Sequence, residues 1–251
     1  MKRMFNGASG HRTVRSVLHS AVTLGAASAL LAIGLMFVVS ATQASATQAS
    51  ATQASSSSGV IAGLDYGPLV GLIGTWKSAP NGGVGVDVAP GQAGSTVGKG
   101  NPAVTPFYET ITYTAAGGAV NASAQHLAAL YYRQQVFAKS NNKKFHDQTG
   151  YLIYDKKDRK VYDTFCIPRG VCVVAEGAPG TTMTLRTKSK GVAETQFMLK
   201  TDRTQAFSVT FKLSGNTLKY KQKTDLQVYG KPFSHTDSDT LKKLKKKKTG
   251  G

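Results

Sequence analysis

The sequence is poor in the residues on which most reactive sites are built. Among its 251 residues it has only two cysteines, one tryptophan, five histidines and 13 acidic residues. Two cysteines cannot make a four-ligand zinc site, and nothing near them supplies the other ligands. No Ser-His-Asp order, paired-carboxylate spacing or phosphate-binding glycine loop with a following helix is present, so no catalytic residue is assigned.

The shortage of acidic residues produces a formal net charge of +18. That charge is unevenly distributed, since four basic residues precede residue 16 and six lysines lie between Lys242 and Lys248. The part between these segments holds the remaining 21 Lys and Arg against all 13 Asp and Glu. More than half of the net charge therefore lies in segments that need not fold, and the sequence does not indicate a specific nucleic-acid partner.

The N-terminal segment is typical of an export signal. Basic residues up to Arg15 precede an uncharged apolar stretch over residues 21–39, and Ala44-Ser45-Ala46 fits a cleavage site of small residues. The apolar stretch is also about the ~20 residues needed to span a bilayer. Residues 1–46 are therefore predicted to be a signal peptide or a membrane anchor. In both cases the rest of the chain is exported: periplasmic, secreted or tethered outside the cytoplasm.

Low-complexity segments flank the part of the chain that is expected to fold. Ala-Thr-Gln-Ala-Ser occurs three times from residue 41 to 55 and has no apolar periodicity, so residues 47–59 are predicted to be a flexible linker. Residues 242–251 are predicted to be a disordered lysine-rich tail that attaches to an anionic membrane surface. One folded domain is expected over residues 60–241.

The domain is dominated by the alternating pattern of β-strands. Every second residue of Phe207–Leu213 is apolar, and the alternation resumes over Leu218–Val228 after a turn. The short segment Leu64–Ile73 is the only helix expected. We predict an all-β fold, a closed antiparallel β-barrel of about ten strands with one short N-terminal helix, and a β-sandwich is the alternative. Further strands are expected over residues 84–88, 106–114, 127–138, 151–154 and 161–165.

Cys166 and Cys172 flank a predicted turn at Pro168-Arg169-Gly170. A hairpin through this turn would place the two cysteines opposite each other, and an oxidising compartment would allow a disulfide between them. The alternative is that both are small apolar residues in neighbouring strands.

The segment Gly67–Trp76 begins a series of familiar motifs. A short helix that leads into Gly-x-Trp at the first strand is similar to the opening of small lipid-binding barrels of the fatty-acid-binding type. The chain continues in order through three further motifs and a final strand near residues 232–244. Taken together, the series resembles the nitrobindin family, the heme-binding barrels related to the C-terminal domain of a human THAP protein. The three motifs are Pro106–Thr112, Phe145–Tyr151 and Ile167–Val171.

The resemblance implies a ten-stranded barrel whose open end holds ferric heme. A histidine near the C terminus ligates the iron, and the opposite face of the heme is open to nitric oxide or peroxynitrite, which some members isomerise to nitrate. His235 is the nearest counterpart of that ligand and is the expected metal ligand. His146, with Phe145 beside it, corresponds to a histidine that borders the heme. Trp76 completes the expected cofactor-binding residues, and packing in the core is its alternative role.

His235 departs from the family pattern, because the usual histidine lies one residue further from the preceding proline. In a strand, a shift of one residue turns a side chain to the opposite face unless a bulge restores it. Asp237 and Asp239 share the face of His235, and carboxylates are a poor lining for an apolar cavity. Without a bulge, an inward Phe233 would bring His235 inward with it.

Three functions stay open at this point. The first is a heme-binding barrel that acts on nitric oxide or peroxynitrite, an enzyme activity implied by the resemblance alone. The second is a barrel that binds a fatty acid or another apolar small molecule without heme. The third is a non-catalytic, surface-tethered structural or interaction domain whose interior is filled with side chains. Of the remaining histidines in the domain, His126 has no support beyond its residue type.

Overall fold

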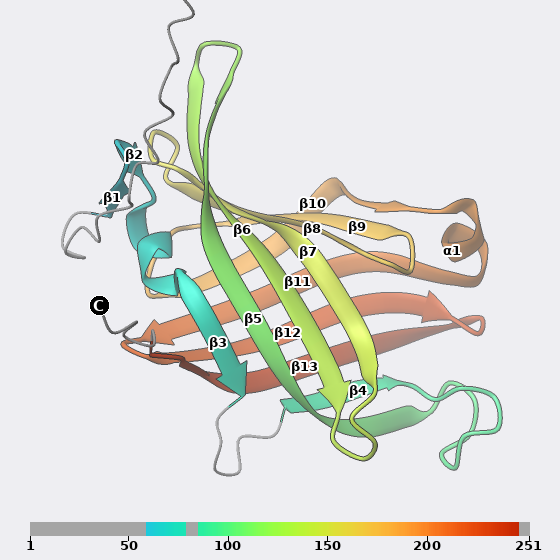
Figure 1. Ribbon diagram of the computed structural model, residues 1–251. Helices are drawn as coiled ribbons and strands as arrows, with labels where there is room; N and C mark the ends of the chain where they lie inside the picture. The colour runs from blue at the N-terminus through green and yellow to red at the C-terminus, as the bar shows by residue number, and fades with distance from the viewer. Residues whose placement is uncertain (1–58, 79–84, 246–251) are drawn as a thin grey trace, which may run out of the picture. The chain divides into compact units, whose positions relative to one another are not determined.

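The computed structural model describes residues 59–78 and 85–245. Most of the described chain is β-structure, with one 3₁₀ helix and one short α-helix (Figure 1). In chain order the elements are β1 (Val60–Ile61), β2 (Leu64–Asp65), η1 (Gly67–Leu72), β3 (Gly74–Ser78), β4 (Gly85–Pro90), β5 (Pro102–Asn121), β6 (Gln125–Ala138), β7 (Lys144–Asp155), β8 (Lys160–Ile167), β9 (Val171–Gly177), β10 (Thr182–Glu194), α1 (Gln196–Thr201), β11 (Asp202–Ser214), β12 (Thr217–Val228) and β13 (Lys231–Lys243).

Eleven of these strands form one antiparallel sheet that closes on itself. Strands β5 to β13 pair with their neighbours in sequence order, and the ring closes through β3 and β4, each of which pairs with both β5 and β13. The strands β3 and β4 meet different stretches of β5 and so share one place in the ring. Closure removes the free edges of a sheet. The predicted closed antiparallel barrel of about ten strands is confirmed, and the sandwich is excluded.

One end of the ring is closed by apolar side chains from the beginning of the domain. The helix η1, which begins at Gly67-Pro68, is the short N-terminal helix that was expected, and its Leu69 and Leu72 are fully buried. Trp76 on β3 is also fully buried, and its indole Nε1 donates a 2.6 Å hydrogen bond to the carbonyl oxygen of Leu72. Satisfying the indole N–H allows this large ring to sit in the core.

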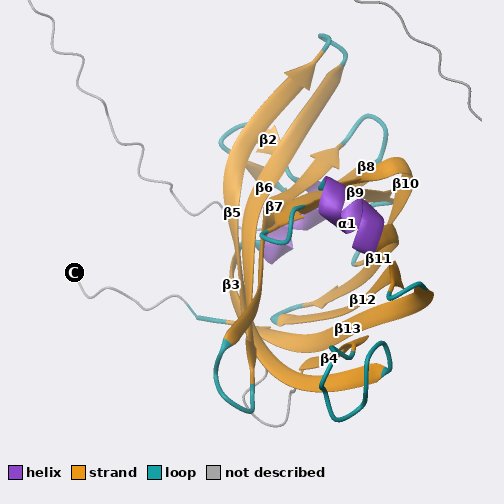
Figure 2. Ribbon diagram, turned by 90° about the vertical axis from the view of Figure 1, so that its right-hand side faces the viewer, coloured by secondary structure: helices purple, strands orange, loops and turns teal. Residues whose placement is uncertain are grey.

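After β9 the structure has two elements that the alternation did not predict. The strand β10 carries a run of polar residues, and its pairing with β9 is interrupted between Thr187 and Val192. The helix α1 follows it and lies against β10 and β11 (Figure 2). Thr195 caps this helix, because its side chain accepts a 3.4 Å hydrogen bond from the backbone N–H of Met198.

The folded domain extends beyond its expected end at residue 241. Strand β13 runs to Lys243, whose Nζ lies 5.3 Å from the centroid of the Trp76 ring and donates a 2.9 Å hydrogen bond to the carbonyl oxygen of Gly71. Lys242 and Lys243 therefore belong to the barrel and not to the tail. The predicted export segment, the linker up to residue 58 and residues 246–251 of the predicted tail lie outside the described residues. In the part of the chain that the structure describes, no helix has the length and apolar character needed to cross a membrane.

The hairpin of β8 and β9 places Cys166 opposite Cys172. The two residues form a disulfide, as the spacing around the turn predicted.

Candidate ligand-binding site

The end of the ring opposite η1 encloses a cavity of about 270 Å³. This volume is just below the range of roughly 300–1,000 Å³ that is usual for small-molecule sites. The lining is mixed: many of the apolar side chains come from β5, β8, β9, α1 and β11, and most of the polar groups come from β4, β6, β7, β12 and β13. The main apolar lining residues are Phe107, Phe165, Val171, Val173, Met198 and Phe207.

His235 reaches this cavity without a bulge. The pairing of β13 with β12 is in continuous register along its length, so alternate residues of β13 share one face. His235 and Asp237 both line the cavity, and Asp239 on the same face is buried. The face shared by His235 and the two aspartates, which the alternation indicated, is thus the inner face of the barrel.

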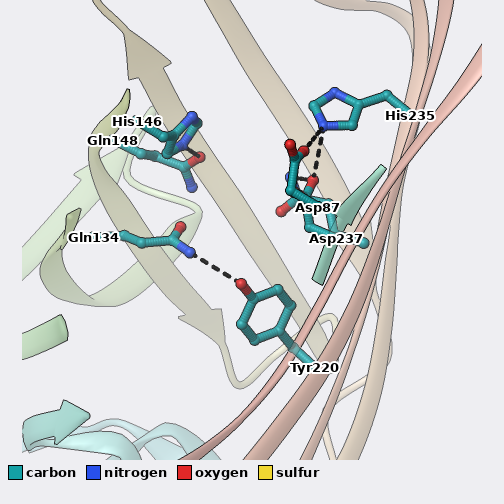
Figure 3. A network of polar contacts seen from close by, with 8 residues as sticks. Asp87, Gln134, His146, Gln148, Tyr220, His235 and Asp237 are labelled. Atoms are coloured by element: carbon teal, nitrogen blue, oxygen red, sulfur yellow. Dashed lines mark hydrogen bonds and ion pairs between the residues drawn. The ribbon is translucent and has the colours of Figure 1, made fainter. Parts of the chain in front are cut away.

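Two carboxylates engage His235. Its Nε2 lies 2.6 Å from Oδ1 of Asp87 on β4 and 3.5 Å from Oδ2 of Asp237 on β13 (Figure 3). Burial alone would lower the pKa of His235, but the hydrogen bonds and charges of Asp237 and Asp87 raise it to about 10. For Asp87, burial has the larger effect and leaves the carboxyl pKa raised. We call these three residues the Asp87–His235–Asp237 cluster.

His146 lies on the other side of the cavity, on β7 (Figure 3). Burial lowers the pKa of its imidazole, which is therefore neutral at neutral pH. Its Nε2 is 3.3 Å from Oε1 of Gln148, and the Gln148 amide donates a 2.7 Å hydrogen bond to the hydroxyl of Tyr132. The second contact fixes the amide with its oxygen toward His146. The Nε2 of His146 therefore carries the proton, and Nδ1 keeps a free lone pair.

The other histidine and the two aromatic residues named from the sequence occupy different places. Phe145 lines the cavity at its exposed rim and packs edge-on against Phe107, with ring centroids 6.3 Å apart. Trp76 lies in the core at the closed end and does not line the cavity. His126 is exposed at the start of β6, also away from the cavity.

A buried polar group lies beside the cavity and was not anticipated as part of a site. The side-chain amide of Gln134 donates a 2.5 Å hydrogen bond to Oε2 of Glu109 and lies 3.4 Å from the hydroxyl of Tyr220. Burial raises the pKa of Glu109 to about 8. Glu109 alternates with the buried apolar residues Phe107 and Ile111 on the inner face of β5, and only this parity could have marked it. Asp87 gave the same kind of signal, as a single acid between two valines.

Comparison with known proteins identifies the domain. Residues 65–243 match the model of the THAP4-like, heme-binding beta-barrel domain. The chain belongs to this family. The resemblance to the nitrobindin and THAP-type barrels seen in the sequence is confirmed. Among solved structures, the crystal structure of Rv2717c from M. tuberculosis is similar, with 18% identity, a TM-score of 0.49, and coverage of 70% of this chain and 95% of that chain. No protein with a curated description matches.

The two sides of the cavity differ in how well they suit the heme of the THAP4-like family. The apolar lining and the neutral imidazole of His146 fit a large apolar macrocycle with an iron that takes a nitrogen ligand. The Asp87–His235–Asp237 cluster fits less well. The Nε2 of His235 is engaged by carboxylates, and an imidazole that holds both protons offers no lone pair to a metal.

Proposed function

We propose that this member of the THAP4-like family binds heme in the cavity at the open end of the barrel. Family membership supports a ligand-binding barrel, and one structural observation supports heme as the ligand. That observation is a partly apolar cavity bordered by an imidazole that burial keeps neutral. Bound through one imidazole, heme iron supplies an open coordination position for a small ligand. By the resemblance, nitric oxide or peroxynitrite is the expected ligand there.

His146 is the imidazole that we propose for the iron. Its proton is held toward Gln148, so its second nitrogen needs no prior deprotonation. His235 is the expected ligand from the sequence. Its Nε2 would have to lose a proton and break its hydrogen bond to Asp87 before it could bind the heme iron. Iron ligation by His235 is the alternative from the sequence, and one titration compares the two histidines.

A fatty acid is the second candidate ligand. Arg169 lines the cavity at the β8–β9 turn and is largely exposed, with its nearest carboxylate, that of Asp202, 4.0 Å away. A guanidinium at the rim of an apolar cavity suits the carboxylate of such a ligand. Heme also carries carboxylates, so the Arg169 contact alone does not separate the two ligands.

We further propose that the barrel works outside the cytoplasm. The disulfide between Cys166 and Cys172 supports this location, because such bonds persist in oxidising compartments. The export-type N-terminal sequence supports it as well. The lysines that follow β13 are proposed to hold the exported protein to an anionic membrane surface.

The heme proposal is tested by titrating the full chain with ferric heme in the presence of EDTA. We expect one heme per chain and a shifted Soret band. Val173→Phe should weaken binding at least about tenfold, because Val173 lines the cavity and a bulkier side chain occupies ligand space. Val174→Phe is the matched control, since Val174 is 50% exposed on the outer face of the same strand.

A normal Soret shift in Val173→Phe, or no shift in the wild type, would contradict the proposal. In the second case, lipid extracted from the protein would favour the fatty acid.

A further inference from the structure

The pairing of β4 with β13 brings two acidic side chains together at the cavity. Asp87 lies directly opposite Asp237 in the register of the two strands. Like charges at directly opposite positions destabilise a sheet. His235, two residues before Asp237 on the same face, places its Nε2 between the two carboxylates.

The three side chains direct their donor atoms to one place. One nitrogen of His235 and one carboxylate oxygen from each aspartate all lie within 4.8 Å of one another. Ligands at 2.0–2.1 Å from a tetrahedral ion lie about 3.3 Å apart. The separations of 2.6 Å and 3.5 Å from His235 Nε2 to the two oxygens lie on either side of that value. Small side-chain movements would therefore suffice to place an ion at equal distance from all three atoms.

The charge around the donor atoms also favours a cation. Within residues 59–78 and 85–245, Asp87 and Asp237 form ion pairs with His235 alone, and no lysine or arginine neutralises either carboxylate. Asp87 is 5% exposed, so solvent screens its charge poorly. The amide of Gln222 donates a 3.1 Å hydrogen bond to Oδ2 of Asp237. Such outer contacts orient a carboxylate ligand in protein metal sites.

We propose that Asp87, His235 and Asp237 bind one divalent first-row transition-metal ion, such as Zn²⁺ or Fe²⁺, at the side of the cavity opposite His146, and that the ion displaces the proton on Nε2 of His235 to solvent. One imidazole nitrogen and two carboxylate oxygens suit these ions, whereas Ca²⁺ takes six or more oxygen ligands and Mg²⁺ prefers an octahedron of oxygens and waters. Three protein ligands leave at least one coordination position, and the cavity gives a small ligand access to it. The site goes beyond the proposed heme binding and uses other residues.

The test uses the full chain, without a histidine tag, after removal of metal and heme. Co²⁺ is the probe, because its visible absorption reports nitrogen and oxygen ligation. We expect one Co²⁺ per chain, displaced by Zn²⁺ and not by Mg²⁺. Asp87→Asn, Asp237→Asn and His235→Ala should each weaken Co²⁺ binding by more than about 100-fold, since losing an outer-shell partner alone costs about 10–100-fold. Asp225→Asn is the control, because Asp225 lies on β12 next to β13 and pairs with Lys223.

Equal Co²⁺ affinity in the control and the three variants, or no stoichiometric binding, would overturn the proposal. X-ray absorption of the Zn²⁺-loaded wild type tests the site without any substitution. One imidazole in the first shell supports it, and none or two would contradict it. The two proposals fail separately, since heme is titrated in EDTA, which removes the metal ion, and Co²⁺ is titrated without heme. Loss of heme binding in the wild type, with Co²⁺ binding intact, would remove the heme proposal only.

Discussion

The hydroxyl of Tyr132 donates a 2.8 Å hydrogen bond to Oδ1 of Asp163 inside the barrel. Both side chains are buried, and Asp163 is only 2% exposed. Burial raises the pKa of Asp163 to about 7, although the hydrogen bond from Tyr132 opposes the shift. Through Gln148, this buried carboxyl group connects to His146 at the cavity.

Asp163 is expected to make the free energy of unfolding fall as the pH rises. Its pKa is raised in the folded state, so its proton stabilises the fold fully below the unfolded value of 3.8, and this stability is lost as the pH rises through about 7. Between pH 4.5 and 7, the wild type should lose about 2–3 kcal/mol more stability than Asp163→Asn. Urea unfolding at the two pH values measures this difference.

The control for that experiment is Asp225→Asn. A hydrogen bond from Lys223 lowers the pKa of Asp225, so this variant should not reduce the fall in stability between the two pH values. The interpretation of Asp163 fails if Asp163→Asn and the wild type lose the same stability.

The disulfide is expected to contribute modestly to stability. It closes a loop with a sequence separation of six residues, and short loops restrict the unfolded chain little. Replacing both Cys166 and Cys172 by serine should lower the free energy of unfolding by about 2 kcal/mol. Denaturant unfolding with and without a reducing agent is the measurement. The reductant should destabilise the wild type to the level of the variant and leave the variant unchanged, and an unaffected wild type would show that the bond contributes nothing.

Two C-terminal deletions separate the tail from the barrel. Removing residues 246–251 should leave the melting temperature unchanged and weaken binding to anionic vesicles at low salt, by about 1 kcal/mol for each lysine near the surface. Removing residues 242–251 should also destabilise the fold by about 1–3 kcal/mol. That deletion removes the pairing of Lys242 and Lys243 with β3 and the cation beside Trp76. Equal melting temperatures for the two deletions would contradict the assignment of these lysines to β13.

The parts of the fold that follow from local pattern could be predicted from the sequence. The alternation over Phe207–Leu213 and Leu218–Val228 gave β11 and β12, and the cysteine spacing around a turn gave the disulfide. The strand β10 and the helix α1 could not be predicted in this way. Residues 186–190 are largely polar and show no apolar alternation, and a six-residue helix depends mainly on its tertiary contacts.

Only some residues of the candidate site could be predicted from the sequence. His146, Phe145 and His235 could be named, because their motifs and residue types are local. The partner of His235 could not, since Asp87 is 148 positions away and meets it only because β4 shares one place in the ring with β3. Non-local strand pairing of this kind leaves no mark within either segment.

The most direct test of heme binding compares three histidine variants of the full chain in one ferric heme titration, followed by the Soret band in EDTA. We expect His146→Ala to lose the shifted band or to weaken heme binding more than tenfold. His126→Ala, at an exposed position away from the cavity, should match the wild type, and His235→Ala should retain the band. Loss of the band in His235→Ala with a normal band in His146→Ala would show that His235, and not His146, ligates the iron. A wild type that shows no Soret shift would contradict heme binding itself.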